Sequence, residues 1–174
     1  MLILFLTNLL LSMSVTSMAS ETNHEIGGLP LTYQLSEVSI SLTRHATARA
    51  GSTINRVSIL GSGNATLEHG GKAIPFAYPS EEKVKLLNAL YKIRYFNLPA
   101  RLNIKYSVFL KEDGSIGTNV LRMSDAASTT ICFNIPDYEK CVTYGSDGPV
   151  ELEILTQAQF DKAELLVSQS ITGK

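Results

Sequence analysis

Short stretches in which apolar and polar residues alternate recur through the first half of the chain. In the first of them, Val38, Ile40 and Leu42 share one face of an extended strand. Gly-rich turns separate the later stretches, so the second and third are expected to pair as a hairpin. The last stretch contains Pro75, which has no amide hydrogen to donate and therefore predicts an edge strand. The four predicted strands are residues 37–43, 56–60, 65–69 and 72–78.

Apolar residues change to helical spacing after Pro79. Ser80 is a favourable N-cap, and Glu81 and Glu82 occupy the first turn, where the helix dipole stabilises negative charge. The expected apolar face comprises Val84, Leu86, Leu87, Leu90, Tyr91 and Ile93. We expect this helix to pack on the sheet and to end before Pro99.

Alternation resumes in the second half and predicts a meander of four more strands. These are residues 104–111, 116–123, 128–133 and 140–144, and Asp113-Gly114 is a hairpin turn between the first two. Pro149 suits the first turn of a second helix, whose apolar stripe continues to about residue 168. The pattern predicts an α+β fold of antiparallel strands with two packed helices, in the order four strands, helix, four strands, helix.

The two cysteines occupy matching positions on the last two predicted strands. Setting Cys132 opposite Cys141 also sets Ile131 opposite Val142, and leaves residues 135–138 as a four-residue hairpin loop. In an oxidising compartment two such cysteines are expected to pair. We therefore predict a structural disulfide between Cys132 and Cys141.

The N-terminus has the pattern of a secretory signal peptide. Residues 1–19 are apolar and uncharged, and they end in the small-x-small sequence Ser17-Met18-Ala19. We expect cleavage after Ala19, a flexible segment over residues 20–36, and a single domain over residues 37–170 with no membrane span. The chain is then exported to the periplasm or the medium. Its pI of about 6.3 and its lack of Trp disfavour nucleic-acid binding.

Charge is divided unevenly along the chain. Up to Lys111 there are eleven Lys and Arg against six Asp and Glu, and after it four against ten. Either the two halves neutralise one another in the fold, or the protein associates with itself or with a charged partner.

No acidic residue lies between Glu37 and Glu68, and this region contains Arg44, Arg49 and Arg56. These arginines belong either to a solvated loop between the first two strands or to a contact surface for a carboxylate or phosphate group. On the second interpretation, Arg44→Ala with Arg49→Ala weakens capture of an anionic partner with little loss of thermal stability.

Known catalytic patterns do not occur in the sequence. The three histidines match no zinc-binding spacing, and there is no Gly-x-Ser-x-Gly motif. The sequence therefore predicts no catalytic residue, no metal and no cofactor. We expect a non-enzymatic binding or accessory protein of the cell envelope, whose partner is an envelope protein or an anionic ligand. Two alternatives stay open: a small envelope hydrolase built from residues distant in sequence, or an inhibitory or structural module.

The order of several short motifs resembles a bacterial family of exported domains of unknown function, found on small exported proteins and lipoproteins. The motifs are SLTR at residues 41–44, the hairpin at 57–71, Ser80-Glu81-Glu82, YFNL at 95–98, and Gly148-Pro149. They span nearly all of the expected domain. Members of the family typically follow the Thr-Arg pair with a Cys-Phe-Gly-x-Cys-Pro loop, which this chain lacks. The resemblance implies the fold and export, and it implies no reaction.

Overall fold

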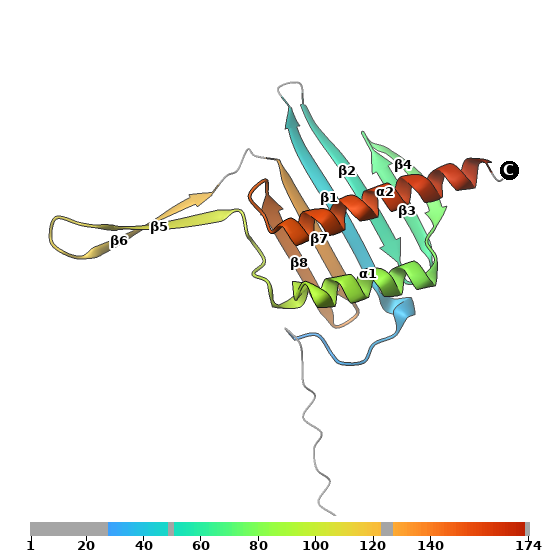
Figure 1. The fold of residues 1–174 in the computed structure, drawn as a ribbon, viewed down its shortest axis with the longest axis horizontal. Coiled ribbons are helices and arrows are strands. Elements are labelled where there is room, and N and C mark those ends of the chain that lie inside the picture. Colours follow the sequence, from blue (N-terminus) through green and yellow to red (C-terminus); the bar gives the residue numbers. More distant parts are fainter. Residues whose placement is uncertain (1–27, 49–50, 123–126, 173–174) are drawn as a thin grey trace, which may run out of the picture.

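The computed structural model describes residues 28–48, 51–122 and 127–172. They form eight antiparallel strands and two long helices, in the order four strands, helix, four strands, helix (Figure 1). The predicted α+β class is therefore confirmed. The expected signal peptide, residues 1–19, lies outside the described residues, as does the start of the segment that follows it.

Six strands make the main sheet, in the order β4-β3-β2-β1-β7-β8, and β5 and β6 pair separately as a two-stranded hairpin. The strands are β1 (Ser39–Ala48), β2 (Gly51–Leu60), β3 (Asn64–His69), β4 (Lys72–Ala77), β5 (Ile104–Leu110), β6 (Ile116–Arg122), β7 (Ser128–Ile135) and β8 (Tyr138–Gly145).

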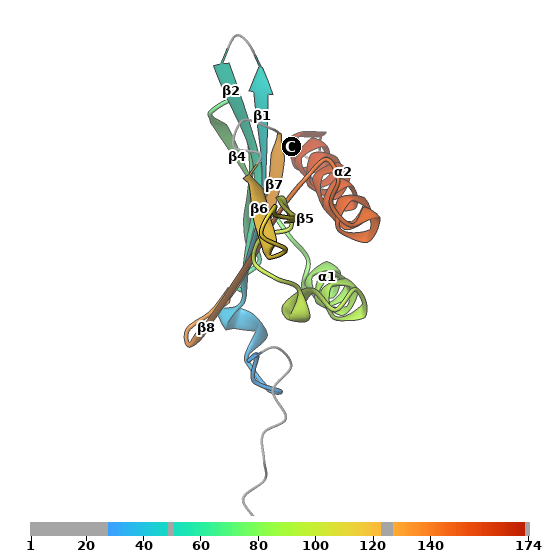
Figure 2. The ribbon, with the colours of Figure 1, turned by 90° about the vertical axis from the view of Figure 1, so that its left-hand side faces the viewer.

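Both helices, α1 (Ser80–Lys92) and α2 (Val150–Thr172), cover the same face of the main sheet (Figure 2). The buried core lies between this face and the helices, and β1, β2, β7 and β8 contribute Leu42, Val57, Ile131 and Val142 to it. Successive side chains of a strand point to opposite faces. The uncovered face is therefore lined by the alternate residues, among which are several Ser and Thr, Arg56, and the two cysteines Cys132 and Cys141.

Two strands are longer than the sequence predicted. β1 continues beyond Thr43 to Ala48, and β2 begins at Gly51 rather than Arg56. The expected loop over residues 44–55 is therefore wrong for the most part, since residues 44–48 and 51–55 lie within strands. The physical reason is that β1 pairs with β2 along its whole length and with β7 as far as His45. Hydrogen bonding on both sides keeps the backbone extended even where the side chains cease to be apolar.

The predicted second meander is also divided. β7 pairs with β1 instead of continuing from β6, because β1 would otherwise be an unpaired edge of an apolar sheet. Within the β7–β8 hairpin the predicted register is confirmed: Cys132 is opposite Cys141, and the two form a disulfide. Ile135 and Tyr138 also pair, so the loop between the strands has two residues rather than four.

Two further details differ from the sequence pattern. Val84 is exposed on α1, whereas Lys83 is buried and its Nζ donates a hydrogen bond to the carbonyl oxygen of Gly61 at 2.6 Å.

The described part of the segment expected to be flexible, residues 20–36, is packed from Leu29 onward: Leu29 is buried in the core, and the Tyr33 ring contacts that of Phe133. No helix in the described part of the chain is long and apolar enough to cross a membrane.

Candidate functional site: a polar row beneath α2

A row of polar residues crosses the main sheet on the face that α2 covers. Directly paired residues of neighbouring antiparallel strands point to the same face. The registers align one residue from each of β3, β2, β1, β7 and β8. These residues are His69, Asn55, Arg44, Thr129 and Tyr144, and we call them the polar row.

The polar row continues the side of the sheet that elsewhere forms the core. Two positions along β1, β2 and β7, the same face carries Leu42, Val57 and Ile131, all of them fully buried. At the row this face changes from apolar to polar while it is still beneath a helix. Polar groups in such a position must find hydrogen-bond partners, because burial without them is costly.

Arg44 finds its partners on α2. Its guanidinium forms an ion pair with Glu153, donates a hydrogen bond to Gln157 Oε1 at 2.8 Å, and lies 5.0 Å from the ring centre of Phe160. Only 26% of its side chain is exposed. Arg44 therefore connects the centre of the sheet to the first half of α2.

Tyr144 makes a second connection to the same part of α2. Its hydroxyl lies 2.8 Å from Thr156 Oγ1 and donates a hydrogen bond to Glu153 Oε2 at 3.1 Å. Burial raises the pKa of Tyr144 to about 12, so the phenol stays protonated and able to donate even at pH 10. Glu153 thus accepts from Arg44 with one carboxylate oxygen and from Tyr144 with the other.

Two hollows lie on either side of Arg44, between the sheet and α2. The hollow toward β8 has a volume of about 290 Å³ and is lined by Arg44, His45, Asn55, Thr129, Ser146 and Glu153, among others. The hollow toward β3 has a volume of about 350 Å³ and is lined by Arg44, Asn55, His69, Gln157, Phe160 and Glu164, among others.

Asn55 lines both hollows and is not fully bonded. Its Oδ1 atom is buried, and it has no hydrogen-bond partner among the described residues. Such an acceptor normally finds a donor in the protein, in water or in a ligand. In the polar row, the side chains of Arg44 and Tyr144 are bonded to α2. The side-chain oxygen Oδ1 of Asn55 is still able to accept a hydrogen bond.

The two described arginines of the predicted contact surface, Arg44 and Arg56, lie on opposite faces of the sheet. Arg44 belongs to the polar row. Arg56 points to the opposite face of the sheet, where its Nε donates to Thr43 Oγ1 at 3.1 Å and its guanidinium lies 3.8 Å from Glu68. Arg49 lies outside the described residues. Their role in contacting an anion stays a prediction.

The divided charge of the sequence has a partial explanation in the fold. Arg44 with Glu153 and Lys105 with Asp147 each pair a base of the first half with an acid of the second. These pairs fit the interpretation in which the two halves neutralise one another.

The carboxylates whose pKa is shifted lie away from the two hollows. Over residues 28–48, 51–122 and 127–172, no three His, Cys, Asp or Glu side chains could hold a metal ion together. Hydrogen bonds lower the pKa of Glu82, Asp113 and Asp147, and none of these three carboxylates lines either hollow. A general acid would need its pKa raised instead.

Sequence reasoning selected Arg44 but missed the other four members of the row. Residues 55, 69, 129 and 144 each lie two positions from a buried apolar residue of the same strand. This spacing places them on the helix-covered face, so it was a usable indication. The alignment of all five could not be predicted, because it depends on the pairing of β1 with β7.

Comparison with known proteins adds no relative: no family model matches the chain, and no curated protein matches it significantly. The resemblance to a family of exported domains therefore stays a prediction.

Proposed function

We propose that this protein is a non-enzymatic binding protein of the cell envelope, which holds a small polar ligand between the polar row and α2. The observation that carries the proposal is the Asn55 carbonyl oxygen, which is buried, unbonded within the described chain, and shared by the two hollows. An acceptor in this position would recognise a ligand that donates a hydrogen bond.

The charges around the hollows favour a ligand without net charge. The Arg44 guanidinium is neutralised by Glu153, so an anion would have to displace this carboxylate from its ion pair. A hydroxyl or amide group could instead bond to Asn55 without breaking any contact. Each hollow is near the lower end of the size range of small-molecule sites, about 300 Å³, which suits a single sugar or a dipeptide.

Export is the part of the proposal that rests on the sequence. The apolar N-terminus motivates it, and the Cys132–Cys141 disulfide is consistent with an oxidising compartment. The first alternative, a hydrolase, would need a catalytic pair in one of the hollows.

The test is titration calorimetry of the exported chain with two uncharged probes, N-acetylglucosamine and the end-blocked dipeptide acetyl-alanyl-alanine amide, and with inorganic phosphate. We expect a neutral probe to bind and Asn55→Leu to weaken its binding at least about tenfold, because the buried, unbonded Oδ1 acceptor of Asn55 is lost. Asn119→Leu, on a distant exposed strand, is the matched control and should leave binding unchanged.

A thermal measurement separates a binding role of Asn55 from a structural one. If the unbonded acceptor serves a ligand, Asn55→Leu removes an unsatisfied buried group, and the melting temperature of the free protein should stay the same or rise. Binding of phosphate alone, or equal binding of the neutral probes to Asn55→Leu, would contradict the proposal.

A further inference from the structure

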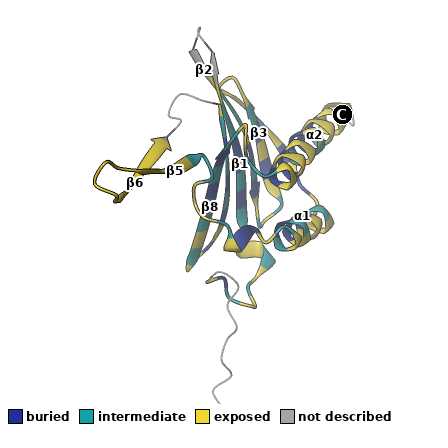
Figure 3. Ribbon diagram, turned by 60° about the vertical axis from the view of Figure 1, so that its left-hand side comes forward, coloured by how far each residue is buried: buried dark blue, intermediate teal, exposed yellow. Residues whose placement is uncertain are grey.

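The β5–β6 hairpin projects from the body of the protein as a separate arm, and most of it is exposed (Figures 1 and 3). An isolated two-stranded hairpin has little stability of its own in water. We call residues Ile104–Arg122 the arm, its end at the body the root, and the turn between its strands the tip.

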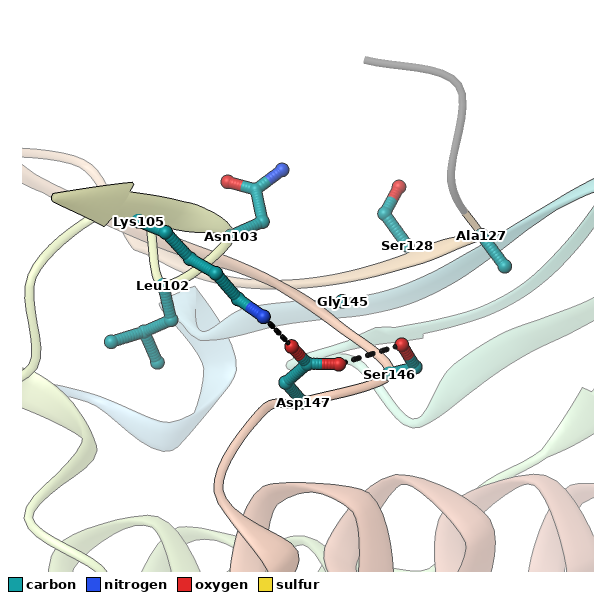
Figure 4. A pocket seen from close by; sticks show the side chains of 8 residues that line it. All are labelled: Leu102, Asn103, Lys105, Ala127, Ser128, Gly145, Ser146 and Asp147. Atoms are coloured by element: carbon teal, nitrogen blue, oxygen red, sulfur yellow. Dashed lines mark hydrogen bonds and ion pairs between the residues drawn. The ribbon is translucent and has the colours of Figure 1, made fainter. Parts of the chain in front are cut away.

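The root of the arm is fixed to the body. The amide of Leu102 donates to the carbonyl oxygen of Thr143 at 2.8 Å, and the amide of Thr143 donates to that of Ala100 at 2.9 Å. Lys105 forms an ion pair with Asp147 across a small cavity of about 20 Å³, which Asn103 also lines (Figure 4). The arm therefore leaves the body in a defined direction.

One face of the arm is apolar and uncovered. The register places Tyr106 opposite Val120, Leu110 opposite Ile116, and Val108 opposite Thr118 between them on the same face, and all of these except Thr118 are apolar. The five apolar side chains are 50–72% exposed. We call them the apolar face. The opposite face carries Lys105, Ser107 and Asn119, together with two apolar side chains, Leu121 and Phe109, and the Phe109 ring lies over Gly117.

Such alternation is typical of a sheet with one solvated face and one buried face. Within the described chain nothing buries the apolar face, since the arm points away from both helices (Figure 1). A contiguous exposed apolar patch of this kind marks an interaction surface.

The charges of the arm differ between its ends. Arg101 lies at the root beside Lys105, whose charge is paired with that of Asp147, whereas Glu112 and Asp113 lie at the tip and outnumber Lys111 there. Two arms that cross in opposite directions would place each acidic tip at the basic root of the other arm. This arrangement also puts the two bodies at opposite ends of the pair, about 20 Å apart along seven residues of strand.

We infer that two copies of the protein associate through their arms, with the apolar faces packed together and the arms antiparallel about a two-fold axis. The contact is self-complementary, as a two-fold interface requires. It goes beyond the proposed ligand site and does not depend on it.

The size of the contact predicts its strength. Five well-exposed apolar side chains bury roughly 500 Å² on each copy, about 1,000 Å² in total, which is the lower limit for a specific interface. The dimer should therefore dissociate in the micromolar range or above, and its population should depend on concentration. A lipid surface is a less suitable occupant, because the apolar side chains lie along one face while the tip carries Glu112 and Asp113.

Sedimentation velocity of the exported chain, from low micromolar up to roughly 200 µM, tests the inference over the range expected for an interface of this size. We expect a reversible monomer–dimer equilibrium. Val108→Lys places a charge at the centre of the apolar face and should raise the dissociation constant by about 30-fold or more. Asn119→Lys adds the same charge to the other face and should leave it nearly unchanged.

The antiparallel orientation has its own test. Glu112→Arg and Arg101→Glu should each weaken the homodimer, because like charges then meet at both ends of the pair. An equimolar mixture of the two variants should dimerise more strongly than either alone, because opposite charges meet again in the mixed dimer.

The inference is overturned by a monomer at every concentration, or by equal effects of Val108→Lys and Asn119→Lys on the dissociation constant. It is also overturned if the mixture of the two charge variants dimerises no more strongly than either variant alone. A monomer that instead binds phosphatidylcholine vesicles through the arm would overturn it too.

Discussion

Removing the Arg44 guanidinium should weaken the attachment of the first half of α2 to the sheet. Arg44→Met keeps most of the aliphatic side chain and loses three contacts at once. The ion pair with Glu153 is partly exposed and contributes about 0.5 kcal/mol. The hydrogen bond to Gln157 and the contact with the Phe160 ring each contribute about 1 kcal/mol.

The expected loss in the free energy of unfolding is therefore about 2–3 kcal/mol, and the melting temperature should fall by roughly 4–10 °C. This outcome is the opposite of the expectation from the sequence pattern, which allowed Arg44 to be replaced with little loss of stability. Thermal and urea unfolding followed by circular dichroism measure the effect.

Arg56→Met is the matched control, because Arg56 occupies the neighbouring β2 strand but points to the uncovered face. Its one hydrogen bond and its long contact with Glu68 predict a loss below about 1 kcal/mol. Equal losses for the two variants would refute the argument that Arg44 holds α2, as would a change below about 0.5 kcal/mol for Arg44→Met.

Other contacts lead to further outcomes. Tyr95→Phe removes a buried hydroxyl that lies 2.7 and 2.8 Å from carbonyl oxygens of β7 and β8, and urea unfolding should show a loss of about 1–2 kcal/mol. Gly61→Ala would place a Cβ atom 2.1 Å from the carbonyl oxygen of Ser36, so the same assay should show a loss of about 2–3 kcal/mol. Burial raises the pKa of Tyr78 and Tyr144 to about 12, from an ordinary value of about 10. The folded state keeps these protons where the unfolded chain loses them, so stability should be complete below about pH 10 and should fall as the pH rises toward 12. A melting temperature that is constant over this range would contradict the assignment.

The periodicity of the sequence was sufficient for the fold class but not for the arrangement of the strands. The hairpins could be predicted from short-range patterns, because a turn and the alternation of apolar and polar residues on either side of it determine the register of the two strands. The Cys132–Cys141 register is the clearest case. The pairing of β1 with β7 is a contact between residues far apart in the sequence, and no local pattern encodes it. The departure of β5 and β6 from the main sheet follows from that pairing, and so it could not be predicted either.

The candidate site was hidden by the same limitation. Polar residues such as Arg44 and Asn55 interrupt the apolar alternation of their strands, and an interruption is usually interpreted as the end of a strand. Here the strands continue, because the backbone hydrogen bonds of the sheet persist beneath α2. Only the three-dimensional alignment shows that these interruptions coincide on one face, where they form a single polar surface.

The ligand site and the arm are structurally adjacent, yet their proposed roles can fail separately. The hollow toward β8 and the small cavity at the root of the arm share Ala127, Ser128, Gly145 and Ser146, so a ligand in this hollow would contact the segment that anchors the arm. Asn55→Leu alters the hollow without touching the apolar face, and Val108→Lys does the reverse. If each variant changes only its own assay, the two surfaces act independently. If Asn55→Leu also removes an effect of the ligand on dimerisation, the shared segment couples them, and linkage requires dimerisation to change ligand affinity by the same factor.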